Sequence, residues 1–197
     1  FQSNIWCFLF FLFLIYETAN DIKTKGKTGY STVSPLIRGE VMLSIILTHL
    51  VFHFILRPRK FKMNSNNRNP TVYFIQNVFV HYVTPYLTVF DYLFFCEKNS
   101  FGLLHPFAWL LLPFAYIIDV FVVAHFITEI PSKKSRYPYF FFDIDLYGIE
   151  KVVKYNIGLG IGLIIFAYLI VLFDRSIHFF QRCSHQETKH LVKEKEN

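Results

Sequence analysis

The sequence is poor in charged residues and in cysteine. Asp, Glu, Lys and Arg make up only 17% of its 197 residues, and most of them fall between long apolar runs. The three cysteines, Cys7, Cys96 and Cys183, are far apart and form neither a CxxC pair nor a metal-ligand spacing. The sequence therefore predicts free thiols, and it supports neither a disulfide framework nor a metal site.

Several common functional motifs are also missing. The sequence contains no GxSxG elbow, no HExxH and no P-loop, so the usual soluble hydrolase and ATPase mechanisms have no support. A GxGxG run at Gly158, Gly160 and Gly162 has no predicted strand before it, and we interpret it as a surface for close helix packing. The net charge of +6 does not favour nucleic acid as a partner, because Lys and Arg cluster at the ends of apolar runs.

Apolar residues, by contrast, are abundant. Hydrophobic residues make up 53% of the chain and aromatic residues 20%, which is more than a soluble domain of this length hides in its core. We therefore predict an all-α polytopic transmembrane helical bundle, located in the cell membrane as a multi-pass protein. The predicted spans are about 1–16, 39–56, 71–96, 103–128 and 149–173, followed by a polar tail at 174–197 that we expect to be partly disordered.

The first predicted span is short. Its apolar part runs from Ile5 to Tyr16, which is fewer than the roughly 20 residues that a spanning helix needs. The chain begins with Phe1 rather than Met, and no signal-peptide charge or cleavage site accompanies the apolar run. We therefore expect this chain to be a fragment that starts inside a helix.

A stripe of polar residues follows one side of the third predicted span. Its members recur at spacings of 4, 3, 4 and 3 on a helix otherwise made of Phe, Tyr, Val, Ile and Leu: Asn77, His81, Thr84, Thr88 and Asp91. Because ionisable and amide groups are costly in lipid, we expect the stripe to face the bundle interior or a wet cavity. His81 is then a candidate for catalysis or ligand binding, and the alternative is a histidine that only joins two helices by a hydrogen bond.

Pro85 and Asp119 extend the hypothesis about His81. A proline removes its own N–H and displaces the carbonyl four residues earlier, which belongs to His81, so we expect a kink and a free carbonyl there. Asp119 in the fourth span falls at about the depth of His81, given a rise of about 1.5 Å per residue. The two side chains could touch, and the carboxylate would then orient the imidazole as a general base. The alternative for Asp119 is structural pairing.

The order of several short motifs resembles a bacterial family of six-span integral membrane proteins. The motifs are Gln2-Ser3-Asn4, Ser34-Pro35 with Arg38-Gly39, His81 followed by Pro85 and Asp91, Pro113 with Tyr116, and Tyr137-Pro138-Tyr139. That family is in turn remotely similar to the androgen-induced membrane proteins, which are intramembrane threonine hydrolases of fatty acid esters of hydroxy fatty acids.

The resemblance implies roles for particular residues. His81 matches the catalytic histidine, Asp91 an acidic residue ten positions on, and His125 a histidine near the end of the next helix. The nucleophilic threonine would lie just before Phe1, and a further helix there would make six spans with both ends cytoplasmic. Asp119 departs from the relatives, which carry an aromatic residue at that position.

Three functions are compatible with these patterns. The first is an intramembrane hydrolase of lipid esters, in which His81 is catalytic and Asn77, Thr84, Thr88, Asp91, Asp119 and His125 bind or orient the substrate. The second is a small transporter or channel with a polar path along the third span. The third is a structural membrane protein whose polar groups stabilise helix packing. The expected partners are membrane lipids, and we predict no cofactor.

Overall fold

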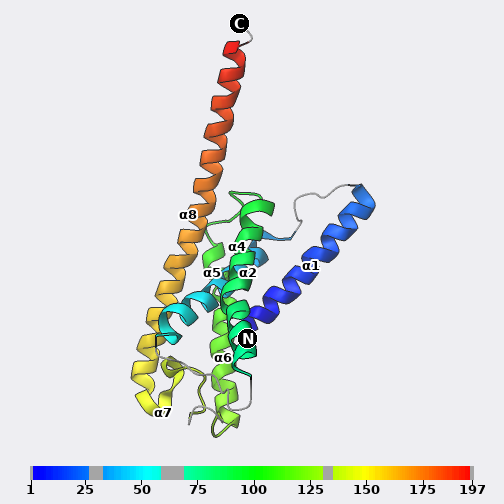
Figure 1. The fold of residues 1–197 in the computed structure, drawn as a ribbon. Coiled ribbons are helices and arrows are strands. Elements are labelled where there is room, and N and C mark those ends of the chain that lie inside the picture. Colours follow the sequence, from blue (N-terminus) through cyan, green and yellow to red (C-terminus); the bar gives the residue numbers. More distant parts are fainter. Residues whose placement is uncertain (1, 27–32, 59–68, 131–134, 196–197) are drawn as a thin grey trace.

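A computed structural model describes residues 2–26, 33–58, 69–130 and 135–195, so Phe1 lies outside the described residues. The regular elements in these ranges are all helical (Figure 1). Five helices are long and apolar enough to cross a membrane, namely Gln2–Lys25, Pro35–Leu56, Thr71–Phe95, His105–Phe126 and Ile149–Cys183. The prediction of an all-α bundle is confirmed, and the chain is an integral membrane protein.

Some of the spans are built from more than one helical element. The first span is α1 (Gln2–Lys25), and the second joins α2 (Pro35–Leu50) to the π-helix η1 (Val51–Leu56). The third joins α3 (Pro70–Val78), the π-helix η2 (Phe79–Val83) and α4 (Thr84–Phe95). The fourth consists of α5 (His105–Ala108) and α6 (Leu111–Phe126). After η3 (Phe140–Phe142) and α7 (Ile144–Tyr147), α8 (Ile149–Lys195) forms the fifth.

Local sequence accounts for where several helices begin. Pro35 and Pro70 occupy the first turns of α2 and α3, where the missing N–H costs nothing and the fixed φ suits a helix. Asn69 caps α3, because its side-chain oxygen accepts a hydrogen bond from the Thr71 N–H at 2.9 Å. Gly148, at φ 77°, separates α7 from α8 in a conformation that residues with a side chain rarely adopt.

Two helices are longer than predicted. α1 continues to Lys25, where Lys25 forms an ion pair with Asp21 one turn earlier at 2.7 Å. α8 continues to Lys195, through the polar segment for which we expected partial disorder. Residues 174–195 contain neither Gly nor Pro, which is compatible with a helix, and the partial disorder of the tail stays a prediction.

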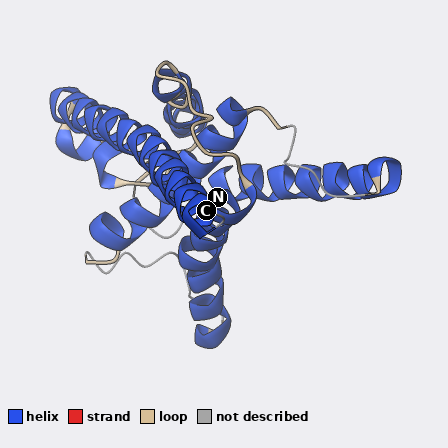
Figure 2. Cartoon of the chain, turned by 90° about the horizontal axis from the view of Figure 1, so that it is seen from above, coloured by secondary structure: helices blue, strands red, loops and turns tan. Residues whose placement is uncertain are grey.

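The helices are arranged loosely around a short central bundle. α8 runs along one side and extends beyond the other helices, whereas α1 leans away from it on the opposite side (Figure 1). Viewed from above, the helices spread outward from the middle of the molecule (Figure 2). One core cluster joins Leu43, Tyr92, Trp109 and Val171 from four segments of the chain. Many large apolar side chains outside the clusters are exposed, as expected for surfaces that face lipid.

Gly39 allows Trp109 to pack closely against α2. The fully buried Trp109 ring lies directly on the backbone of α2 at Gly39, and its indole N–H donates to the Leu36 carbonyl at 2.9 Å. A Cβ atom at position 39 would overlap the ring.

We therefore expect Gly39→Ala to lower the free energy of unfolding by about 1–3 kcal/mol, the usual effect of overpacking. The matched control is Gly162→Ala in α8, where an added Cβ meets no atom within 4 Å. The control should be neutral or slightly stabilising, because Ala favours a helix over Gly. Detergent-induced unfolding followed by tryptophan fluorescence measures both, and equal stabilities would contradict the close approach of Trp109.

Candidate functional site

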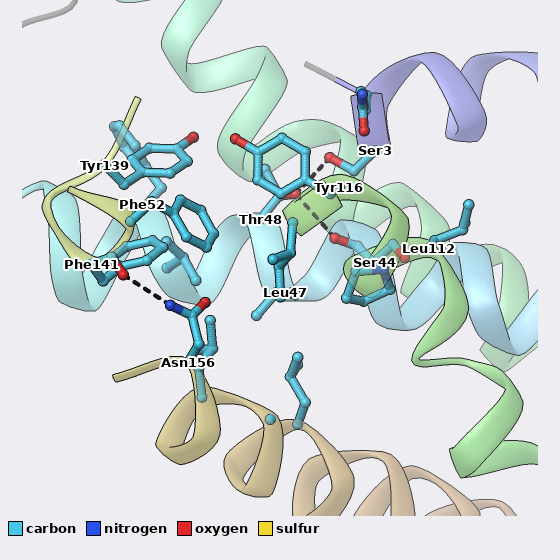
Figure 3. A pocket seen from close by; sticks show the side chains of 18 of the residues that line it. Ser3, Ser44, Leu47, Thr48, Phe52, Leu112, Tyr116, Tyr139, Phe141 and Asn156 are labelled. Atoms are coloured by element: carbon cyan, nitrogen blue, oxygen red, sulfur yellow. Dashed lines mark hydrogen bonds between the residues drawn. The ribbon is translucent and has the colours of Figure 1, made fainter. Parts of the chain in front are cut away.

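A cavity of about 170 Å³ lies where α1, α2, η1, η2, α6 and α8 approach one another (Figure 3). Apolar side chains form most of its wall, among them Leu47, Phe52, Leu112, Leu159 and Leu163. Hydroxyl, amide and imidazole side chains interrupt this wall, and they are Gln2, Ser3, Ser44, Thr48, His81, Tyr116, Tyr139 and Asn156. A mostly apolar cavity with a few polar groups is typical of a binding site for a small apolar ligand.

His81 reaches this cavity from the π-helical turn η2. Pro85 has no N–H to donate to the carbonyl of His81. The backbone before it forms a π-helical turn, in which the Thr84 N–H donates to the Phe79 carbonyl, five residues earlier. The expected free carbonyl of His81 is, however, occupied. Nδ1 of His49 donates to it at 2.7 Å, so this carbonyl is a contact between two helices and not a substrate contact.

The imidazole of His81 is held by packing. Its ring lies parallel to the Phe52 ring, with centroids 3.8 Å apart and planes inclined by 3°. Its Nδ1 atom is buried and has no hydrogen-bonding partner in the described part of the chain. Among the described residues that line the cavity, His81 is the one with an imidazole, a side chain that can accept a proton and return it. It is therefore the group best suited to transfer a proton at this site.

The expected contact between His81 and Asp119 does not form. Asp119 instead accepts a hydrogen bond from the side-chain amide of Gln2 at 2.9 Å, close to the lipid-facing surface. The depth argument treated each span as one straight helix. The fourth span, however, breaks between Ala108 and Leu111, and the third contains a π-helical turn.

The rest of the polar stripe does not line the cavity, and Thr88 and Asp91 instead contact neighbouring helices. Thr88 is buried, donates to the Thr84 carbonyl at 2.9 Å and lies 3.3 Å from the sulfur of Cys7 in α1. Asp91 forms an ion pair with Arg38 of α2 at 2.8 Å. Asn77 and Thr84 are half-buried in α3 and α4.

His125 also lies away from the cavity. Its side chain is exposed near the end of α6, with its ring beside Phe126. Of the residues that the sequence analysis assigned to a site, His81 is therefore the one that lines the cavity.

Sequence reasoning missed a short chain of hydroxyl groups in the cavity. Thr48 donates to the Ser44 carbonyl at 3.0 Å, so its oxygen is left to accept the proton of Ser3 at 2.6 Å (Figure 3). Ser44 and Thr48 are four residues apart on one face of α2, a spacing visible in the sequence. Ser3 comes from a different helix, and nothing local predicts that it meets them.

Tyr139 and Asn156 complete the polar groups on the other side of the cavity. Burial raises the pKa of Tyr139, although a hydrogen bond from Tyr116 opposes this effect, so Tyr139 stays a neutral hydroxyl. The Asn156 side-chain nitrogen donates to the carbonyls of Phe141 at 3.0 Å and Val152 at 2.8 Å. Its side-chain oxygen has no partner among the described residues.

A second polar cluster lies at the end of the bundle where α4 ends. Asp174 of α8 is fully buried and accepts from the Tyr92 hydroxyl at 2.5 Å and the Phe101 N–H at 3.1 Å. Lys98 donates to the backbone carbonyls of Tyr92 and Cys96. These bonds tie α8 to the loop after α4, so the cluster is structural.

Comparisons of this chain with models of protein families, with curated proteins and with solved structures found no match. A function proposed for this chain therefore has to account for the cavity. Its apolar wall, its imidazole and its hydroxyl groups are the observations that a function has to explain.

Proposed function

We propose that this integral membrane protein hydrolyses lipid esters within the bilayer, with His81 as the general base. The observation that carries the proposal is the imidazole of His81 in the wall of an otherwise apolar cavity, with Nδ1 unpartnered in the described chain. The resemblance to the six-span family and to the intramembrane threonine hydrolases points the same way, and it suggests the cell membrane as the location.

The start of α1 supports a hydroxyl nucleophile at this cavity. Gln2 and Ser3, in the first described turn of α1, line the same cavity as His81. The resemblance places the nucleophilic threonine next to this turn, upstream of Phe1. A hydroxyl carried by this end of α1 would therefore share the cavity with the imidazole.

The proposed reaction has two steps. In the first, His81 takes the proton of the hydroxyl while the hydroxyl oxygen bonds to the ester carbonyl carbon, and the departing alkoxide takes that proton to leave as an alcohol. In the second, His81 takes a proton from water while the water oxygen bonds to the acyl carbonyl carbon; the bond from that carbon to the enzyme oxygen breaks, and the enzyme oxygen takes the proton from His81. The products are one acid and one alcohol for each ester and water consumed, and the nucleophile is restored.

The surface near Trp6 offers a route for lipid. Trp6 lines the cavity, yet 47% of its surface is exposed on the outer face of α1. An acyl chain dissolved in the bilayer can therefore reach the cavity sideways without crossing water. This favours a lipid substrate over a soluble ester.

The transporter alternative has less support. A polar path along the third span would need Thr88 and Asp91 to face an open lumen. In the structure Thr88 contacts Cys7, and Asp91 is paired with Arg38, so side chains of α1 and α2 fill this part of the stripe.

The full-length protein, purified into lipid nanodiscs, tests the proposal. We expect it to release acid and alcohol from a fluorogenic fatty acyl ester, and to be labelled by a fluorophosphonate that reacts with an activated hydroxyl. Mapping the adduct by mass spectrometry should locate it at the start of α1, and persistent labelling of a Ser3→Ala variant would assign it to the upstream threonine. Proton-coupled uptake of a solute into liposomes without any ester cleavage would overturn the hydrolase proposal.

A further inference from the structure

We propose that the cavity selects an uncharged single-chain lipid with a free hydroxyl in its head group, such as a monoacylglycerol, over lipids with charged head groups. The inference rests on the proposed function, since it names the substrate class of the same cavity, and it departs from the fatty acid esters of hydroxy fatty acids that the resemblance implies, because those esters carry a free carboxylate. Three features support the inference: the charge of the described residues that line the cavity, their unpaired polar atoms, and the volume of the cavity.

The wall carries no formal charge. The described residues that line the cavity include no Asp, Glu, Lys or Arg. A carboxylate or phosphate placed there would lose its water without gaining a positive partner, which is strongly unfavourable at membrane depth. Two carboxylates bond to lining residues, Asp119 to the Gln2 side chain and Glu40 to the Leu112 N–H, and their negative charge would repel an anionic head group.

Unpaired polar atoms concentrate at this cavity. In the described part of the chain, four buried side-chain atoms have no hydrogen-bonding partner, and three of them belong to lining residues: Ser44 Oγ, His81 Nδ1 and Asn156 Oδ1. Ser44 is only 7% exposed. Such atoms are costly unless something satisfies them, and a ligand with polar groups would do so.

Asn156 specifies a donor on the ligand. The hydrogen bonds fix which way the side-chain amide of Asn156 points. Its nitrogen donates to two backbone carbonyls, and an amide oxygen at that place could not donate. The unpaired oxygen can therefore only accept a hydrogen bond, and an uncharged lipid donates one through a hydroxyl. The Ser44 hydroxyl can donate in turn to an ester or hydroxyl oxygen. Because both atoms are buried, we expect the ligand to displace the side chains that now cover them.

The size of the cavity fits a small head group and the start of one chain. At about 10–15 Å³ for each water-sized group, a cavity of about 170 Å³ holds on the order of ten non-hydrogen atoms. A glycerol head with the first carbons of an acyl chain is of this size. The rest of the chain would leave past Trp6 into the bilayer.

Binding is best measured with ether lipids, because an ether cannot be cleaved and the result does not depend on catalysis. The full-length protein in nanodiscs is titrated with 1-O-octadecylglycerol, with its dimethyl ether that lacks hydroxyl groups, with its phosphate monoester and with stearate. Tryptophan fluorescence and native mass spectrometry report binding. We expect the glycerol ether to bind at least about tenfold more tightly than each of the others.

Ser44→Ala supplies the test at the residue level. We expect this variant to bind the glycerol ether several-fold more weakly while its unfolding is unchanged or shifted to higher detergent, since an unsatisfied buried hydroxyl is removed. The matched control is Ser176→Ala, whose hydroxyl donates to the Leu172 carbonyl within α8. That variant should bind like the parent protein.

The outcomes separate this inference from the proposed function. Equal or tighter binding of stearate or the phosphate would overturn the selection against charge, and equal binding of the dimethyl ether would overturn the role of the hydroxyl. If the protein also cleaved charged esters in that case, the hydrolase proposal would still hold. Selective binding of the glycerol ether without cleavage of any ester would support the inference about the lipid and overturn the hydrolase.

Discussion

Replacing His81 by alanine is expected to lower the rate of ester cleavage by the full-length protein at least about a hundredfold, because a general base contributes roughly 10²–10⁴ to such a reaction. The bundle should remain folded. The side chain gives up its stacking on Phe52, a contact worth about 0.5–1.5 kcal/mol, and its Nδ1 has no hydrogen bond to lose among the described residues. Initial rates in nanodiscs and the detergent-unfolding midpoint measure the two effects.

Two further variants isolate the role of the imidazole. His81→Phe keeps an aromatic ring against Phe52 but removes the base, so it should be as inactive as the alanine variant while preserving stability. His178→Ala removes a histidine of α8 that does not line the cavity, and it should retain activity. A His81→Phe protein that cleaves esters at the parental rate would refute His81 as the base.

Replacing Arg38 by methionine is expected to destabilise the bundle by about 3–5 kcal/mol, because it leaves the Asp91 carboxylate without its partner in a largely buried site. The Arg38 side chain is only 9% exposed and that of Asp91 20%. Arg38 also donates to the sulfur of Cys96 and lies over the Phe10 ring, with 5.6 Å between its guanidinium and the ring centroid. One residue thus joins α1, α2 and the end of α4.

A double-mutant cycle distinguishes the loss of the charge pair from the loss of packing. Arg38→Met combined with Asp91→Leu removes both charges, and it should be clearly more stable than Arg38→Met alone. Arg136→Met is the control, since Arg136 pairs with Asp145 at 2.7 Å in an exposed position and such pairs contribute little. Additive effects of the two changes at positions 38 and 91 would contradict a coupled pair.

The two halves of the polar stripe have separate roles. The half at Thr88 and Asp91 contacts Cys7 and Arg38, so it stabilises the packing of the third span on α1 and α2. The half at His81 faces the cavity. A regular polar spacing therefore indicates the side of a helix that faces its neighbours, but it does not show which of its members line a cavity.

The contact between His49 and the His81 carbonyl could not be predicted from periodicity. Pro85 reveals in the sequence that the carbonyl of His81 loses its usual donor, and we predicted a kink with a free carbonyl there. The donor that replaces it is the imidazole of His49, 32 residues earlier in another span. Which side chain meets a freed carbonyl depends on how two helices pack, and no local pattern records that.

The sequence by itself determined the parts of this protein that depend on neighbouring residues. Whether a segment prefers lipid to water is set by its own side chains, so the all-α class and the five apolar helices could be predicted. The inward side of the third span followed from spacing on a single helix.

Only the tertiary structure decided which residues share a cavity. Ser3, Ser44, His81 and Asn156 come from four different spans, and only the packing of these spans brings the four residues to one cavity. Contacts between distant segments depend on the packing of whole helices, so the expected depth of each residue did not reveal that Asp119 bonds to Gln2 and not to His81. The chemistry proposed for this protein therefore depends on packing, whereas its residence in a membrane follows from composition alone.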